Sequence, residues 1–257
     1  MDTLSLKPQI DLFEQSMSEL ELLLKSANIF EQIGDRELNP SPDDILSKTA
    51  KGISFVFLFS AYEQLLKGTV RAVLETANSY RGKLKNMQDG FIAAALNSSF
   101  RSYADAANVK TKICNVKGVR SLLDSYVRDL KFTDYFPDDG SYMKSTQVRT
   151  ICNLFDLGDP APILGRAWSH IDDFQDKRNA IAHGSVLPST IGENYSALDI
   201  ETFYTEWRDG WVAFAEHTEK ESLNPRFWTR RSPVPYRLAG LAESATGVSG
   251  LDIGNGV

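Results

Sequence analysis

The sequence predicts an all-α protein of about six to seven helices, arranged around one long central helix. Apolar residues recur at steps of three and four through most of the chain, which is the spacing of one buried helix face. Clusters of glycine, proline and aspartate interrupt this pattern at intervals that suit helices of ordinary length. No segment alternates convincingly as a strand would, and no internal repeat is visible.

The first two predicted helices differ in how their apolar residues are arranged. Residues 8–33 carry an apolar residue at every third or fourth position, and Gly34 follows as a common residue after a helix end. Ser41 is suited to cap the second helix, residues 41–79. Its centre, residues 55–59, is apolar on all sides. The second helix is therefore predicted to be the central core helix.

The rest of the chain is predicted to form shorter helices joined by polar connections. Helices are expected at residues 83–107, 119–131, 146–157 and 162–184, and a last one opens at Ser196 or Asp199 and ends near Ser222. Connections are expected at residues 35–40, 108–120, 132–142 and 185–195. The last helix carries large residues at helical spacing, which predicts core positions: Phe203, Trp207, Trp211 and Phe214.

Three units are predicted along the chain. Residues 1–40 form an N-terminal helix that packs on the domain, residues 41–223 form the helical domain, and residues 224–257 form a C-terminal extension. Glycine, alanine and serine are frequent at the end of the extension, which predicts disorder there.

The composition limits the classes of function. The chain has 257 residues, a formal net charge of −6 and a sequence pI of about 5.2, whereas a general nucleic-acid binder is usually basic. A site for RNA would therefore have to attract phosphate locally. Two cysteines, Cys114 and Cys152, and three histidines give neither a disulfide framework nor zinc-ligand spacing. No metal and no cofactor are predicted.

The sequence contains no segment that predicts membrane insertion or export. The N-terminal residues lack a basic stretch followed by an apolar core, so no signal peptide is evident. The longest dense apolar run, residues 53–62, is too short to span a bilayer. We therefore expect a cytoplasmic protein with no membrane partner.

The most informative segment is residues 178–184, RNAIAHG, at the end of the predicted helix 162–184. The apolar stripe of this helix consists of Leu164, Trp168, Ile171, Phe174 and Ile181. Arg178 lies where the stripe should be apolar, and a cation there is costly unless it is paired. In a regular helix Arg178 and His183 lie about 140° apart around the axis. They should flank one groove, with Asn179 between them.

This motif resembles the active site of the HEPN superfamily, in which an arginine is followed after four to six residues by a histidine. The run at residues 59–75 is similar to the long early helix of HEPN domains, which often carries a glutamate, here Glu63. The element order over residues 41–223 also resembles that superfamily. The resemblance implies a helical bundle and a metal-independent ribonuclease, of the group found in prokaryotic toxin and antiviral defence systems.

The chemistry of these side chains suits RNA cleavage. The imidazole of histidine titrates at about pH 6.5 and can transfer protons at neutral pH, which is the role expected of His183. Arg178 is expected to bind phosphate oxygens through its planar guanidinium, and Asn179 to fix the imidazole or the substrate. Glu63 and Lys67 are candidate supporting residues. The plainer alternatives are a histidine that only caps its helix and a surface pair four residues apart.

Two further groups of charged residues admit both a functional and an ordinary interpretation. One is an acidic group that could bind a metal or could be a solvated helix face: Asp172, Asp173 and Asp176. The other is a basic group that could guide RNA or could be ordinary surface: Lys110, Lys112, Lys117 and Arg120.

We therefore expect an endoribonuclease that acts on RNA as a homodimer, with two motifs forming one composite site, as a toxin or antiviral effector. An antitoxin or a sensor protein is a further expected partner. The first alternative is a HEPN fold with a silent site, serving as a scaffold or partner-regulated subunit, and the acidic pI favours it. The second is a different helical protein in which residues 178–184 only end a helix.

Overall fold

A computed structural model describes residues 3–27, 29, 45–127 and 143–230. These residues form ten α-helices and one short 3-10 helix, η1, with two isolated β-bridges and no strand among them. The all-α prediction is confirmed. The helices are α1 (Lys7–Ser26), α2 (Ile45–Asn78), η1 (Leu84–Asn86), α3 (Asp89–Asp105), α4 (Val109–Asp124), α5 (Ser145–Leu154), α6 (Pro160–Leu164), α7 (Ala167–Ala182), α8 (Pro188–Gly192), α9 (Ala197–Ser222) and α10 (Pro225–Trp228).

The number of helices is slightly above the six to seven that were predicted. Three helices account for the difference, because α6, α8 and α10 have only four or five residues each. Helices this short carry no periodic apolar pattern from which they could be recognised.

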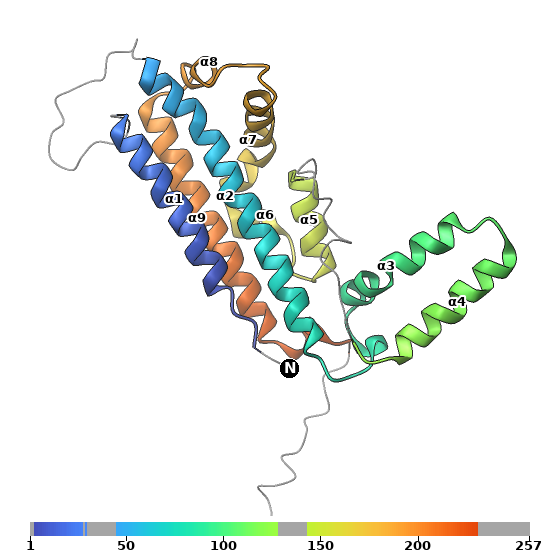
Figure 1. The fold of residues 1–257 in the computed structure, drawn as a ribbon. Helices are drawn as coiled ribbons and strands as arrows, with labels where there is room; N and C mark the ends of the chain where they lie inside the picture. The colour runs from blue at the N-terminus through green and yellow to red at the C-terminus, as the bar shows by residue number, and fades with distance from the viewer. Residues whose placement is uncertain (1–2, 28, 30–44, 128–142, 231–257) are drawn as a thin grey trace, which may run out of the picture.

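The centre of the fold is α2, a helix of 34 residues and about 51 Å at 1.5 Å per residue. Helices α1 and α9 lie beside it along most of its length, and α7 and α8 pack on its N-terminal half (Figure 1). Buried residues cover most of the circumference of α2, including Phe55, Leu58 and Phe59, whereas Phe57 is 37% exposed on the remaining side. The prediction of a central core helix is therefore confirmed.

Aromatic side chains fill the space between α2 and α9. Trp207 and Trp211 are fully buried, and both rings lie close to the ring of Tyr62, with centroids 5.6 and 4.3 Å away. The indole nitrogen of Trp207 donates a hydrogen bond of 2.8 Å to the carbonyl of Leu58. Phe214 is also buried. These residues belong to the core, as predicted, whereas Phe203 is only partly buried.

The backbones of α8 and α2 approach so closely that glycine is required on both helices. A Cβ atom on Gly52 would lie 1.8 Å from the carbonyl oxygen of Pro188, and one on Gly192 would lie 1.8 Å from that of Lys48. Gly52 therefore serves as a contact point inside α2 and not as a break in it. This contact holds the segment that follows α7 against α2.

Several predicted boundaries in the first half of the chain were wrong. Helix α1 ends at Ser26 with Ala27 as its cap, although the prediction extended to residue 33, and Gly34 and Ser41 lie outside the described residues. The predicted helix 83–107 begins with η1, and α3 starts only at Asp89. Residues 108–120 are helical in α4 and do not form a connection, because the Asn108 side chain accepts a hydrogen bond from the amide of Thr111 and caps the helix.

The second half also departs from the prediction at three places. The predicted helix 162–184 is two helices, α6 and α7, because Gly165 has a φ of +56° and breaks the helical path. The predicted connection 185–195 contains α8, and the C-terminal extension contains α10. The last long helix begins after Ser196, whose hydroxyl accepts from the amide of Asp199 in a capping box, as predicted. The connection 132–142 lies outside the described residues.

Helices α3 and α4 form a hairpin that projects away from the helical bundle (Figure 1). Helix α4 packs on α3 and η1. At the opposite side of the bundle α1 packs along α2 and α9. The division of the chain into three units stays a prediction. None of the described helices is both long enough and apolar enough to cross a membrane.

Candidate functional site

The motif 178–184 closes α7 with a tight C-terminal turn. His183 is the last residue in near-helical conformation, and Gly184 follows with a φ of +69°. The carbonyl of Ala180 accepts the amide of Ser185 at 2.9 Å, and the carbonyl of Ile181 accepts that of Gly184 at 3.0 Å. These two bonds are those of a Schellman motif, in which glycine is preferred at the residue with positive φ. The glycine is therefore explained by the backbone alone.

Arg178 lies at the junction between α7 and α2 and has partners on both helices. Its Nη1 donates to Oδ1 of Asn179 at 2.9 Å, and its Nη2 lies 3.8 Å from Oε2 of Glu63 on α2. Its guanidinium carbon lies 5.6 Å from the ring centroid of Phe59, so the cation also contacts an aromatic face. Only 27% of the Arg178 side chain is exposed. The cation on the apolar stripe is thus paired, as its position requires.

Glu63 links the arginine to a lysine one turn further along α2. Its Oε1 accepts a hydrogen bond of 2.6 Å from Nζ of Lys67, while Oε2 faces Arg178. The side chain of Glu63 is 14% exposed, so the carboxylate is largely removed from water and held between two cations. The sequence predicts that a buried Glu63 would pair with Lys67 or with Arg178, and in the fold both cations lie against it.

His183 is exposed and stands apart from this network. Among the described residues its imidazole has no hydrogen bond, ion pair or ring contact, and only its backbone amide is engaged, with the carbonyl of Asn179 at 2.9 Å. The side chain of Asn179 turns to Arg178 and does not contact the imidazole. The histidine ring therefore does not bond to the end of its own helix, although its backbone forms part of the turn.

The acidic residues on α7 have individual structural roles. Asp172 accepts hydrogen bonds from the amide and the hydroxyl of Ser145, at 2.7 and 2.8 Å, and thereby caps the first turn of α5. Asp173 pairs with Lys177 four residues later, and Asp176 lies 3.8 Å from Lys144. In the part of the chain that the structure describes, no group of three or more acidic, histidine or cysteine side chains could hold a metal ion.

Tyr62 lies beside Glu63 in the sequence but belongs to the core. It is fully buried, and its hydroxyl donates to the carbonyl of Met143 at 3.1 Å. Burial raises the pKa of Tyr62 well above its usual value, and the charge of Glu63 adds to this effect. The phenol therefore stays neutral and structural.

Sequence reasoning missed Phe59 as part of the site. It contacts Arg178 through its ring face and precedes Glu63 by one helical turn on α2. That spacing of four residues was the available signal, but Phe59 also belongs to a run of apolar core residues that masked it. The basic group of residues 110–120 lies on the projecting α4 and not among the contacts of Arg178.

The comparisons with known proteins agree with this architecture. A model of the RiboL-PSP-HEPN family matches residues 13–220, which run from α1 to the last turn of α9. No curated protein and no solved structure matches the chain. HEPN domains in general act as nucleases or bind RNA, and they are helical. Because the match covers most of the sequence, the chain belongs to the RiboL-PSP-HEPN family.

Proposed function

We propose that the protein is a metal-independent endoribonuclease that uses His183 for proton transfer and Arg178 to bind phosphate. One observation carries the proposal. An exposed imidazole without a partner among the described residues lies five residues from a guanidinium that is fixed in place by a carboxylate, an amide and an aromatic ring. Together the two side chains supply proton transfer and phosphate binding, which phosphodiester cleavage requires.

The reaction would proceed through the 2′-hydroxyl of the RNA. A neutral His183 imidazole takes the proton of the 2′-OH, and the 2′-oxygen attacks the adjacent phosphorus. The bond between phosphorus and the 5′-oxygen then breaks, and the leaving oxygen takes a proton from a second, protonated imidazole. The products are a 2′,3′-cyclic phosphate and a free 5′-hydroxyl.

Arg178 would stabilise the negative charge that builds up on the phosphate oxygens. One N–H of Arg178 donates to Asn179 at 2.9 Å, and Glu63 lies further away, at 3.8 Å from Nη2. Other N–H groups of the guanidinium therefore stay available to bind phosphate. Glu63 would orient the guanidinium, and Lys67 would hold the second oxygen of that carboxylate. In this scheme Asn179 positions the arginine and not the histidine.

The second imidazole would come from another copy of the chain. Two motif ends apposed across a two-fold axis would supply two imidazoles and two guanidiniums around one phosphate. The apolar side chains of α7, such as Ile171 and Phe174, are buried within their own chain. The interface would therefore use exposed residues after the motif, among which Leu187 is 69% exposed. A role as a toxin or antiviral effector, with an antitoxin or sensor partner, rests on the resemblance alone.

A second candidate function is that of a silent binding or scaffold subunit regulated by a partner protein. The observation that favours it is electrostatic, because the chain carries a formal net charge of −6 and a carboxylate faces Arg178. In that case the arginine would serve the packing of α7 on α2.

A cleavage assay separates the two candidates. Purified wild-type protein is incubated with end-labelled single-stranded RNA, beside His183→Ala and a matched control, His217→Ala. His217 is a partly buried histidine on α9 whose ring contacts the carbonyl of Leu157 at 3.1 Å. The proposal predicts cleavage by the wild type and by the His217 variant, and none by the His183 variant. Absence of cleavage in all three would favour the silent subunit.

A further inference from the structure

Helix α4 carries an apolar stripe that no other residue in the described part of the chain covers. None of its sixteen residues is buried, and Val109, Ile113 and Val116 are 72%, 51% and 43% exposed. These three residues follow one another at steps of four and three, so they lie on one side of the helix. Such a seam on a projecting helix is typical of a helix that packs against other helices.

The side chains that flank this stripe are basic. Residues 108–120 contain four cations and no acidic residue. Lys110 and Lys117 lie seven residues apart along one edge of the stripe, and Arg120 continues the stripe by one turn. All three are exposed, and no ion pair joins any of them to the other described residues. Lys112 differs, because its ammonium lies 5.6 Å from the ring centroid of Tyr103 on α3.

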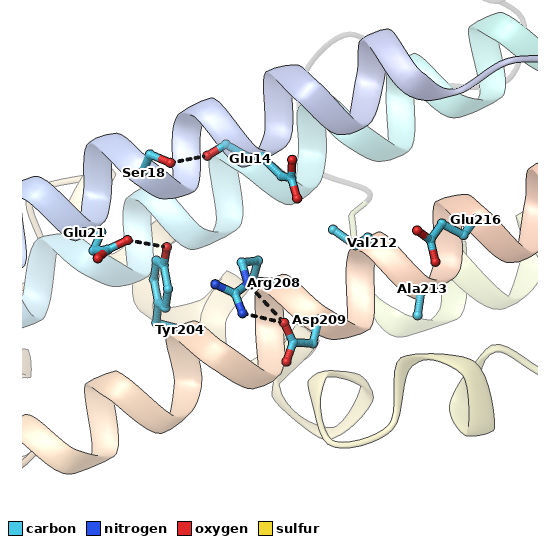
Figure 2. Close-up of a pocket in the computed structure, with 9 residues that line it drawn as sticks. All are labelled: Glu14, Ser18, Glu21, Tyr204, Arg208, Asp209, Val212, Ala213 and Glu216. Carbon is cyan, nitrogen blue, oxygen red and sulfur yellow. Dashed lines mark hydrogen bonds and ion pairs between the residues drawn. The ribbon is translucent and has the colours of Figure 1, made fainter.

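On the other side of the bundle, α1 and α9 form a groove of complementary character (Figure 2). It has a volume of about 470 Å³, and Val212, Ala213 and Tyr204 contribute its apolar surface. Four carboxylates and one guanidinium also line it: Glu14, Glu21, Asp209, Glu216 and Arg208.

The carboxylates of the groove are not equally engaged. Oδ1 of Asp209 accepts from Nε and Nη2 of Arg208, at 3.0 and 2.9 Å. Glu21 lies 2.5 Å from Lys25, whose hydrogen bond lowers the pKa of the Glu21 carboxyl. Neither Glu14 nor Glu216 has an ion pair with any of the described residues. The groove therefore keeps one carboxylate on each helix for an external cation.

The spacing of the charges matches between the stripe and the groove. Glu14 and Glu21 are seven residues apart on α1, and Asp209 and Glu216 are seven residues apart on α9. Each pair spans about 10.5 Å along its helix, as do Lys110 and Lys117 on α4. One member of each acidic pair, Glu21 or Asp209, already has a cation of its own chain, so Glu14 and Glu216 are the carboxylates left for the cations of α4. With the α4 stripe in the groove, the basic side chains beside the stripe would thus face the acidic side chains that line the groove. In helix packing, such flanking charges select the partner and the register.

We propose that α4 docks into the α1–α9 groove of a second copy of this chain. A contact between two α4 stripes is disfavoured because it would bring the basic side chains of both copies together. Single-stranded RNA would also satisfy the cations, but it favours aromatic stacking surfaces, whereas the stripe itself is aliphatic. Because stripe and groove are different surfaces, the contact forms either a reciprocal two-fold dimer or a larger assembly.

The test reverses the charges on each side separately and then on both. Lys110→Glu with Lys117→Glu should weaken self-association at least tenfold in sedimentation velocity at micromolar concentration, and Glu14→Lys with Glu216→Lys should do the same. The variant with all four changes should regain association, because opposite charges then face each other again. The control is Arg81→Glu with Arg226→Glu, two exposed arginines elsewhere, and it should associate like wild type. Thermal unfolding of each variant verifies the fold.

Three results would overturn the proposal. A wild-type protein that stays monomeric at about 100 micromolar has no such contact, because this is about one hundred times the concentration at which association is expected. If the variant with all four substitutions folds normally but fails to associate, the two surfaces do not pair. The third result is that both double variants associate like wild type, while only the α4 variant loses binding to single-stranded RNA. In that case α4 is an RNA-binding surface. None of these readouts depends on ribonuclease activity. A monomeric wild type would also exclude the motif dimer of the proposed function, whereas the response to charge reversal on α4 and in the groove tests the α4 contact alone.

Discussion

Replacement of Arg178 by lysine tests whether the site needs a guanidinium or only a positive charge. Lysine keeps the charge but presents it as a compact ammonium without the planar fork that binds two phosphate oxygens. We expect the rate of RNA cleavage to fall at least tenfold, which is a loss of about 1.4 kcal/mol of transition-state stabilisation.

The cost of this change to folding can be worked from the structure and should be small. Arg178→Lys removes the hydrogen bond of 2.9 Å to Asn179 and weakens the contact with the Phe59 ring, at a side chain that is 27% exposed. We estimate a loss of about 1 kcal/mol of unfolding free energy. In a domain of this size that lowers the melting temperature by about 2–4 °C. A folded but much slower enzyme is therefore the expected outcome.

The assay follows cleavage of a labelled RNA under single-turnover conditions, with a thermal melt of each variant. Arg166→Lys is the matched control, because Arg166 is an exposed arginine at the start of α7 that pairs with Glu206 at 3.1 Å. It should cleave at the wild-type rate. Near-normal cleavage by Arg178→Lys would exclude bidentate phosphate binding by Arg178, since only the charge would then matter or the residue would be structural.

Three further predictions address the assembly and the core. When wild-type chains are refolded with excess His183→Ala chains, RNA cleavage should fall more than the fraction of wild-type chains does, because mixed dimers would hold an incomplete site. A fall in proportion to the wild-type fraction would mean that each chain has a whole site. Gly52→Ala should destabilise the fold by about 1–3 kcal/mol, because its Cβ has no space, while Gly118→Ala, with open space around it, should be neutral or stabilising in denaturant melts. Maleimide at pH 7 should modify Cys114 but not Cys152, since burial raises the pKa of the Cys152 thiol to about 12; a second thiol modified without unfolding would contradict the structure.

The parts of the fold that local pattern determines could be predicted from the sequence. The run at residues 55–59 is apolar throughout and lies in the central helix α2, where Phe55, Leu58 and Phe59 are fully buried and Phe57 is 37% exposed. The Ser196 cap lies where it was predicted, and Trp207, Trp211 and Phe214 are core residues as their spacing predicts, whereas Phe203 is only partly buried. Residues 108–120 were not predicted as a helix, although Val109, Ile113 and Val116 recur at steps of four and three, because four cations interrupt this short pattern and α4 buries none of its side chains.

The candidate site was only partly predictable because it joins two helices that are far apart in the sequence. The motif itself and the pair of Glu63 and Lys67 follow from short-range spacing. The approach of Arg178 to Glu63 and Phe59 depends on how α7 packs on α2, which in turn depends on the close contact of α8 at Gly52. The side chain of Asn179 was expected to fix the imidazole or the substrate, but in the structure it contacts Arg178.

The most direct test of the proposed ribonuclease is the product of RNA cleavage in excess EDTA. Wild-type protein should cleave under these conditions and leave a 2′,3′-cyclic phosphate and a 5′-hydroxyl, whereas His183→Ala should not cleave although its melting temperature stays close to that of wild type. Cleavage that survives the loss of His183 would exclude this residue as the proton-transfer group. Activity that vanishes in EDTA and returns with magnesium or manganese would contradict the metal-independent mechanism, because the reaction would then depend on a metal ion.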